Sequence, residues 1–267
     1  MSAPRPPLSP AVLAGATLFV AALACGEVPT LPGGIAYISP VILPSPAVAV
    51  GDTLRDSTGV VAPIQLFGIG NSGDTVRTID PVFVVTTVPG KSVSITETGL
   101  VIGDSVRTAQ IVGQLGSRLQ TAPVSLDVVN QPDSMAASGP VSARFPAPTA
   151  TEVFSTVSLG VTVTSPPTTT APRAGVKSII VRYEVTRIFP ASASIPDTTL
   201  VLVDDAGRFR LPTGRASRDT TDASGNATRR LRAIPLGFDS VEISASATNL
   251  RGVALKGSPI RFIATTK

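Results

Sequence analysis

The sequence predicts an all-β fold built from two antiparallel β-sandwiches in tandem. Apolar and polar residues alternate in many short runs from about residue 45 to the C-terminus, the pattern of strands that bury one face and wet the other. The 25 Pro and 23 Gly are spread along the chain, as turns between short strands require. No convincing amphipathic helix interrupts this pattern.

Three runs show the alternation most clearly, at residues 156–163, 177–186 and 241–248. The predicted inward faces are Val157, Leu159, Val161 and Val163; Ile179, Val181, Tyr183 and Val185; and Val241, Ile243, Ala245 and Ala247. In the middle run the opposite face carries Arg182, Glu184 and Thr186. Each run is therefore expected to be a strand of a sheet that is buried on one side.

A break in the pattern falls near Asn130–Pro140. It follows the strand-like run 123–129 and precedes further β pattern. Each side of the break holds roughly 90–130 residues, the size of one β-sandwich domain. The sequence therefore predicts two domains joined near this point.

The only cysteine, Cys25, follows an apolar run over residues 11–24. That run is shorter than the roughly 20 residues that a membrane-spanning helix needs, but it has the length of a signal-peptide core. Ala22-Leu23-Ala24-Cys25 resembles the lipobox of bacterial lipoproteins. The resemblance implies cleavage before Cys25 and lipid on its sulfur and amine, which would anchor the chain through several acyl chains. Two alternatives are an ordinary signal peptide with an incidental cysteine and an uncleaved N-terminal helix.

Residues 26–36 hold two Pro and three Gly and are expected to form a short tether after the anchor. Gly26, rather than Asp, follows the cysteine. In bacteria with two membranes, the resemblance to lipoproteins then favours sorting to the outer membrane. The expected location is thus the cell envelope.

Two further stretches resemble known domain families. Residues 93–112 read as a strand, a Thr-Gly-Leu-Val-Ile-Gly turn and a second strand that contains Thr-Ala-Gln-Ile. This stretch resembles the group 2 bacterial Ig-like domain, and residues 48–54 fit the early strand of that domain. Residues 220–228 resemble the Thr-Asp-x-x-Gly-x-Ala turn of group 1, invasin-like, Ig-like domains. The runs 181–185 and 259–264 lie where that family places strands.

Together these observations predict five segments: a lipoprotein signal peptide at 1–24, a lipidated N-terminus and tether at 25–36, a group 2-like Ig-like domain at 37–130, a linker at 131–140 and an invasin-like Ig-like domain at 141–267. The resemblance implies an adhesion, structural or protein-interaction role at the envelope. This implication is an analogy between folds, because Ig-like domains serve many functions.

Composition argues against catalysis. The chain has no His and no Trp, one Cys and two Tyr, and a formal net charge of +4. The absence of His removes the Ser-His-Asp and Cys-His forms of nucleophilic catalysis and the commonest metal ligand. A single Cys makes neither an internal disulfide nor a Cys-rich zinc site. We therefore expect no enzyme activity, no catalytic residues, no cofactor and no metal.

Basic residues gather in one region, at Arg208, Arg210, Arg215, Arg218, Arg229, Arg230 and Arg232. One hypothesis is contact with an anionic envelope polymer, with Arg229, Arg230 and Arg232 as the candidate residues. The competing interpretation, which we favour, is a solvated strand face with weak surface ion pairs. No nucleic acid is expected as a partner, because few aromatic side chains are present to stack bases.

Residues 219–226 offer oxygen ligands that could hold Ca²⁺, but they lack the spacing of an EF-hand loop. A hairpin turn with Gly225 and Asn226 at positive φ is the favoured interpretation. The expected functions, in order, are an envelope structural or adhesion module bound to the membrane through Cys25, a binding module for anionic polymer through residues 208–232, and a hydrolase with an unrecognised carboxylate site. Envelope proteins or polysaccharide are the candidate partners.

Overall fold

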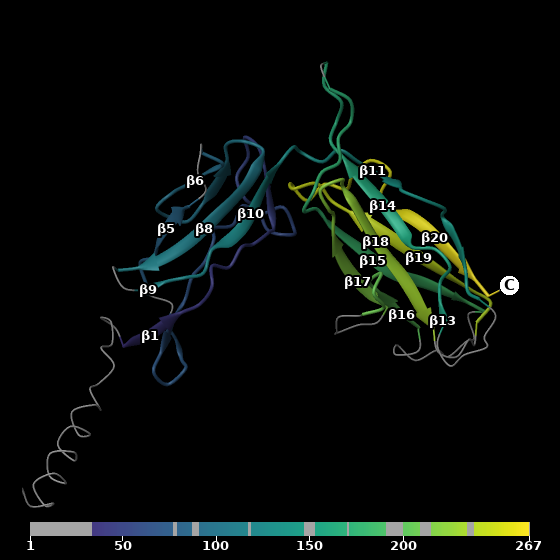
Figure 1. The fold of residues 1–267 in the computed structure, drawn as a ribbon, viewed down its shortest axis with the longest axis horizontal. Helices are drawn as coiled ribbons and strands as arrows, with labels where there is room; N and C mark the ends of the chain where they lie inside the picture. Colours follow the sequence, from purple (N-terminus) through teal and green to yellow (C-terminus); the bar gives the residue numbers. More distant parts are fainter. Residues whose placement is uncertain are drawn as a thin grey trace, which may run out of the picture. The chain divides into compact units, whose positions relative to one another are not determined.

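A computed structural model describes residues 34–76, 79–86, 91–116, 119–146, 153–169, 171–190, 200–208, 215–233 and 238–266. Within these ranges every regular element is a β-strand (Figure 1). The chain divides into two compact units, one from Met1–Ser39 and Phe67–Ile79 and the other from Pro40–Leu66 and Asp80–Lys267. Among the described residues, no helix is long and apolar enough to cross a membrane.

The smaller unit contains a three-stranded antiparallel sheet. Its strands are β1 (Ile35–Ile38), β3 (Gly68–Gly70) and β4 (Thr75–Val76), in the order β1-β3-β4. The Phe67 N–H donates to the Ser39 hydroxyl at 2.9 Å. Strand β1 begins at Ile35, so it includes the last two residues of the segment that was predicted to be a tether.

The larger unit contains a first β-sandwich over the N-terminal half of the chain. One sheet has the order β2-β10-β8-β5, with β9 paired to β8; its strands are β2 (Ala47–Ala49), β5 (Val82–Val85), β8 (Arg107–Leu115), β9 (Leu119–Gln120) and β10 (Val124–Val129). A hairpin of β6 (Val93–Ile95) and β7 (Val101–Gly103) makes a second sheet. The strands predicted at the two ends of residues 93–112 are therefore confirmed. The predicted turn is shorter than expected, since its last residues form β7, and Gly99 has φ +79° within it.

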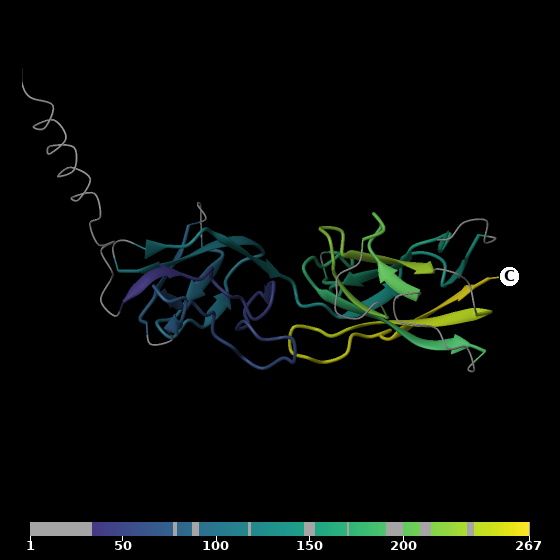
Figure 2. The ribbon, with the colours of Figure 1, turned by 90° about the horizontal axis from the view of Figure 1, so that it is seen from below.

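The second sandwich has two five-stranded sheets, seen as two layers in Figure 2. One has the order β11-β14-β18-β13, with β16 also on β18; its strands are β11 (Ser134–Ala137), β13 (Val153–Phe154), β14 (Leu159–Thr164), β16 (Leu200–Val203) and β18 (Asn226–Ala233). The other has the order β12-β20-β19-β15-β17; its strands are β12 (Ser142–Arg144), β15 (Ile180–Phe189), β17 (Ala216–Thr220), β19 (Ser240–Ala247) and β20 (Ile260–Thr265).

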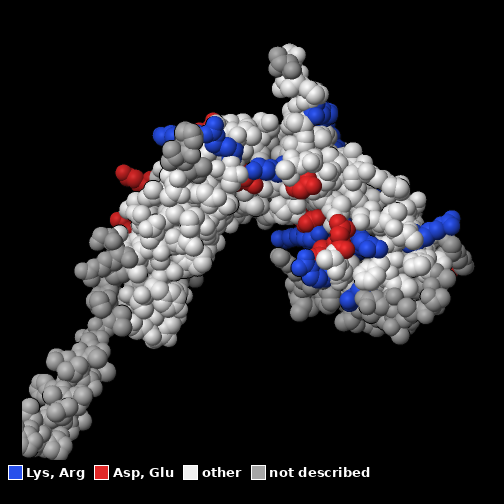
Figure 3. All heavy atoms as spheres, viewed as in Figure 1, with Lys and Arg blue, Asp and Glu red and all other residues white. Residues whose placement is uncertain are grey.

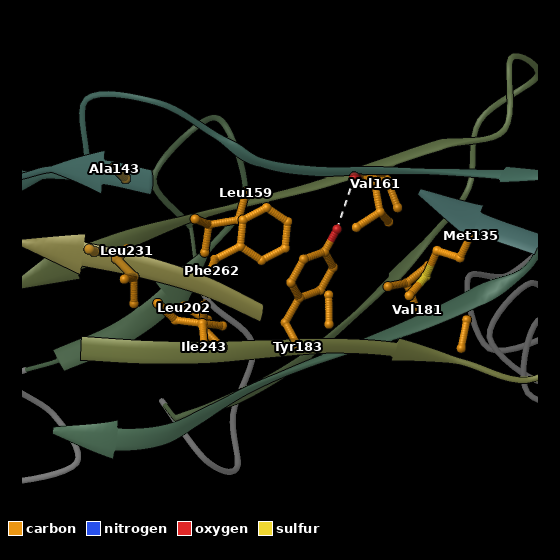
Figure 4. Packing of buried hydrophobic residues seen from close by; sticks show 14 of the residues in the cluster. Met135, Ala143, Leu159, Val161, Val181, Tyr183, Leu202, Leu231, Ile243 and Phe262 are labelled. Atoms are coloured by element: carbon orange, nitrogen blue, oxygen red, sulfur yellow. Dashed lines mark hydrogen bonds between the residues drawn. The ribbon is translucent and has the colours of Figure 1, made fainter. Parts of the chain in front are cut away.

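The core of this sandwich follows the predicted alternation (Figure 4). Ten of the twelve predicted inward residues are buried, and Val157 and Val185 pack against them while partly exposed. Tyr183 and Phe262 are fully buried between the sheets. The Tyr183 hydroxyl donates to the Ala227 carbonyl at 2.9 Å, which satisfies the one polar atom of this side chain and joins the two sheets. Burial raises the pKa of Tyr183, the neighbouring Asp219 carboxylate adds to the rise, and Arg229 opposes it.

Two strand pairs in these sandwiches are parallel. Strand β2 runs parallel to β10, and β12 runs parallel to β20. In each case an early strand of a sandwich pairs with its last strand. Parallel neighbours need a long connection, and here the rest of the sandwich supplies it.

A strand also lies in the segment expected as a linker, residues 131–140. Strand β11 pairs antiparallel with β14, and the Asp133 N–H donates to the Thr164 carbonyl at 2.9 Å. The strand is only four residues long, too short for a clear alternation, so no strand was predicted here. The five-segment division of the chain remains a prediction.

Candidate functional site

The arginine-rich region is organised around the turn that joins β17 to β18. The Asp222 carboxylate oxygen Oδ1 accepts the N–H groups of Ser224 and Asn226 at 2.8 and 2.9 Å, and Gly225 has φ +81°. A turn is present, but the prediction of a hairpin is wrong, because β17 and β18 belong to different sheets. The prediction of positive φ at Asn226 is also wrong. Asn226 begins β18 opposite Thr162 of β14, and the ladder holds it extended.

Arg229 of β18 lies between the two sheets of the second sandwich. It alternates in phase with the buried Ala227 and Leu231, and its side chain is 13% exposed. Its guanidinium donates to the Ser217 hydroxyl at 3.0 Å and to the carbonyls of Thr228 and Arg218, and it pairs with Asp219 at 2.9 Å. Because Ser217 and Asp219 belong to β17, the edge strand of the other sheet, Arg229 links the two sheets.

Arg230 and Arg232 lie on the opposite side of β18 from Arg229. The Arg230 guanidinium carbon lies 5.3 Å from the centre of the Phe154 ring, and Nη2 donates to the Ser155 carbonyl at 2.9 Å. Arg232 is opposite Phe154 of β13 and Val201 of β16. The structure therefore does not bring the three candidate polymer-binding arginines together on one face, and polymer binding by them remains a prediction.

The other described arginines of the region are dispersed. Arg208 pairs with Asp204 in the turn after β16, at 3.0 Å and with its side chain 80% exposed. The Arg215 carbonyl accepts the Val185 N–H at 2.8 Å. Arg218 of β17 faces outward, directly opposite Arg182 of β15. Figure 3 shows basic and acidic side chains intermixed over this part of the second sandwich rather than a field of one sign.

Two aspartates fix the chain on either side of residues 130–132. Asp127 of β10 pairs with Lys177 at 2.6 Å and accepts hydrogen bonds from the hydroxyls of Thr108, at 2.6 Å, and of Ser178. Burial disfavours the charged carboxylate, but the hydrogen bonds from Lys177, Ser178 and Thr108 outweigh it and hold the pKa of Asp127 below its usual value.

Asp133 is held in the same way. It pairs with Lys256 at 3.0 Å and Arg173 at 3.1 Å, and hydrogen bonds from these two side chains lower the pKa of its carboxyl. The Met135 N–H donates to the Lys256 carbonyl at 2.8 Å. These contacts fix the segment that contains β11, so the predicted linker is held over much of its length.

The predicted lipidation residue, Cys25, lies outside the described residues. Within the described ranges, no group of three or more His, Cys, Asp or Glu side chains is arranged to hold a metal ion. The oxygen-rich turn at residues 219–226 instead uses Asp222 to hold its own backbone and Asp219 to pair with Arg229.

No protein-family model matches the chain, and no curated protein matches it. Solved structures similar to it include the Yersinia pseudotuberculosis adhesin InvE, at 14% identity and a TM-score of 0.34, covering 89% of this chain and 61% of that one. Domains 4 and 5 of the S-layer protein SbsC are 12% identical, with a TM-score of 0.29 and coverages of 86% and 99%. A β-glycosidase from Bacteroides vulgatus is 11% identical, with a TM-score of 0.27 and coverages of 80% and 24%.

The chain thus spans about three fifths of the length of the InvE structure. At these TM-scores the similarities bear on neither mechanism nor partner. The strand pairing itself defines the class: the chain is an all-β protein with tandem Ig-like β-sandwiches.

Proposed function

We propose that this protein is an exported envelope lipoprotein, anchored by lipid on Cys25, whose Ig-like sandwiches act as a non-catalytic structural or adhesion module. The observation that carries the proposal is the apolar run 11–24 ending in Ala22-Leu23-Ala24-Cys25, with this cysteine the only one in the chain. A lipid anchor needs several acyl chains to hold a protein stably, and a lipobox cysteine receives them.

The described contacts support a load-bearing role. Asp127 and Asp133 tie residues on either side of 130–132 to Lys177 and Lys256. Arg229 and Tyr183 join the sheets of the second sandwich. Such cross-links suit a module that transmits force or holds a surface in place, since the Arg229 and Tyr183 contacts must break before the two sheets separate.

Metabolic labelling with a palmitate analogue tests the anchor. We expect the wild type to incorporate label and to fractionate with membranes, and Cys25→Ser to do neither. Cys25→Ala serves as a second variant, since loss of label in both excludes an effect peculiar to serine. Equal labelling of wild type and variants, or an unlabelled wild-type chain free in the medium, would overturn the proposal.

Placement at the outer membrane and exposure to the medium are the finer parts of this proposal. Protease treatment of intact cells tests exposure, with a periplasmic protein as the control. We expect the sandwiches to be cut in intact cells. Protection until the outer membrane is opened would place the module in the periplasm instead.

A further inference from the structure

Two arginines lie directly opposite each other on the outer face of the sheet β12-β20-β19-β15-β17. Arg182 of β15 and Arg218 of β17 are partners in the antiparallel ladder, and both are exposed. Like charges at opposed positions of neighbouring strands destabilise a sheet. This pair therefore has a cost to folding that a bound anion would relieve.

The nearby acidic groups compensate the pair only in part. Arg182 pairs with Glu184 at 3.0 Å, with both side chains about half exposed, and such surface pairs contribute little. Arg261, farther along the same face, pairs with Glu242 at 3.6 Å. Among the described residues, the Arg218 side chain makes no hydrogen bond or ion pair, which leaves one guanidinium available.

The arginine pair lines a hollow of about 530 Å³. Hydroxyl groups from several strands and loops share this lining: Ser45, Ser57, Ser178, Ser244, Ser246 and Ser258. One carboxylate, Asp56, also lies there. Its Oδ1 atom accepts hydrogen bonds from the Thr58 N–H, the Thr58 hydroxyl and the Val60 N–H, so it is engaged in its own turn.

We propose that this hollow binds a phosphate-type oxyanion, held by Arg182 and Arg218 with hydroxyl groups of the surrounding serines. Guanidinium groups recognise phosphate through paired, charge-assisted hydrogen bonds, and two of them approach from neighbouring strands. Four of the six serine hydroxyls can donate to the remaining oxygens, whereas those of Ser178 and Ser246 already donate to the Asp127 carboxylate and the Arg182 carbonyl. Among the described residues, no aromatic side chain lines the hollow, so the charged group, rather than a stacked ring, would be recognised.

This inference goes beyond the proposed anchor and does not depend on it. The phosphate could belong to a lipid headgroup or to a soluble or polymeric phosphate, and the recognising chemistry is the same. Arg218 belongs to the arginine-rich region of the sequence, whereas Arg182 comes from a different strand. The site therefore differs from the set Arg229, Arg230 and Arg232 expected from sequence.

The test is calorimetric titration of the mature chain, lacking residues 1–24 and carrying Cys25→Ser, with inorganic pyrophosphate. We expect saturable binding that weakens with added salt and that falls by about tenfold or more in Arg218→Gln and in Arg182→Gln. The matched control is Arg261→Gln, which removes an arginine from the same sheet face and should leave binding unchanged. Circular dichroism before titration confirms that each variant is folded.

Absence of pyrophosphate binding by the wild type, or equal loss in Arg218→Gln and Arg261→Gln, would overturn the site. Vesicles containing phosphatidic acid identify the source of the phosphate. Arg218-dependent binding to these vesicles assigns a lipid headgroup, and Arg218-dependent binding to pyrophosphate alone assigns a soluble or polymeric phosphate. Both results support the site, and neither depends on whether Cys25 carries lipid.

Discussion

Arg218 and Arg229 lie on adjoining strands and touch, yet they have opposite environments. The Arg229 side chain is 13% exposed and is bound to four groups between the two sheets of the second sandwich. Arg218 supplies one of those groups, its carbonyl, while its own side chain faces outward opposite Arg182. Clustering in sequence therefore does not make a common surface. On a strand, successive side chains point to opposite faces, so arginines that are close in sequence can lie either between the sheets or on the outer surface.

The same alternation of buried and exposed side chains can be tested in β20, where we expect its largest effect on the free energy of unfolding. Phe262 is fully buried, and its neighbour Ile263 is 49% exposed. We expect Phe262→Ala to lower the free energy of unfolding by about 3–5 kcal/mol, since it loses apolar burial and leaves a cavity. Ile263→Ala should change it by about 0.5 kcal/mol or less. Urea unfolding followed by circular dichroism measures both, and similar losses would show that the two faces of β20 are not distinguished.

The turn between Arg218 and Arg229 is the next test. Gly225 has φ +81°, and a Cβ atom there would lie 2.4 Å from the Val163 carbonyl oxygen. Gly116 also has positive φ, but a Cβ atom would meet no atom within 4 Å. We expect Gly225→Ala to cost about 2–3 kcal/mol, from backbone strain and a clash, and Gly116→Ala about 1 kcal/mol, from strain alone. Thermal unfolding ranks the two variants, and an equal loss would exclude the clash.

Asp127 offers a smaller test, because its basic partner Lys177 is 33% exposed whereas Arg229 is 13% exposed. Its pKa is lowered in the folded protein, so its contribution is present above the unfolded value of about 3.9 and is lost as pH falls through the folded value. We expect Asp127→Asn to cost about 1 kcal/mol at pH 7, a figure that allows for solvent screening. The difference from wild type should shrink below about pH 4.

The measurement for Asp127 is urea unfolding of both proteins at pH 7 and again through the acid range. Glu184→Gln is the control, because its pair with Arg182 is about half exposed on both sides, and we expect a change of about 0.5 kcal/mol or less. A difference between wild type and Asp127→Asn that stayed constant or grew towards acid pH would contradict the assigned role of the carboxylate.

Much of the second sandwich could be predicted from its sequence, because the strands over 156–163, 177–186 and 241–248 have long, regular alternation. Within β18, Arg229 falls in phase with the buried Ala227, Leu231 and Ala233. Applied to the arginine cluster, it would have separated Arg229 from Arg230. The sequence does not reveal the partners of Arg229, because Ser217 and Asp219 belong to a strand of the other sheet.

Other features depended on contacts that are distant in sequence. Strand β11 is four residues long, and its place in the second sandwich depends on pairing with β14 and on Lys256. The parallel pairing of β12 with β20 joins segments more than a hundred residues apart. The opposition of Arg182 to Arg218 is likewise set by the β15–β17 register, which neither run of sequence shows alone.

The central claim is that Arg229 holds the second sandwich together whereas Arg218 does not. The most direct test is urea unfolding of Arg229→Gln and Arg218→Gln under identical conditions. We predict that Arg229→Gln lowers the free energy of unfolding by about 1–3 kcal/mol, because Asp219 and two carbonyls lose a partly buried donor, and that Arg218→Gln changes it by about 0.5 kcal/mol or less. Equal losses, or a larger loss for Arg218→Gln, would contradict this division of roles.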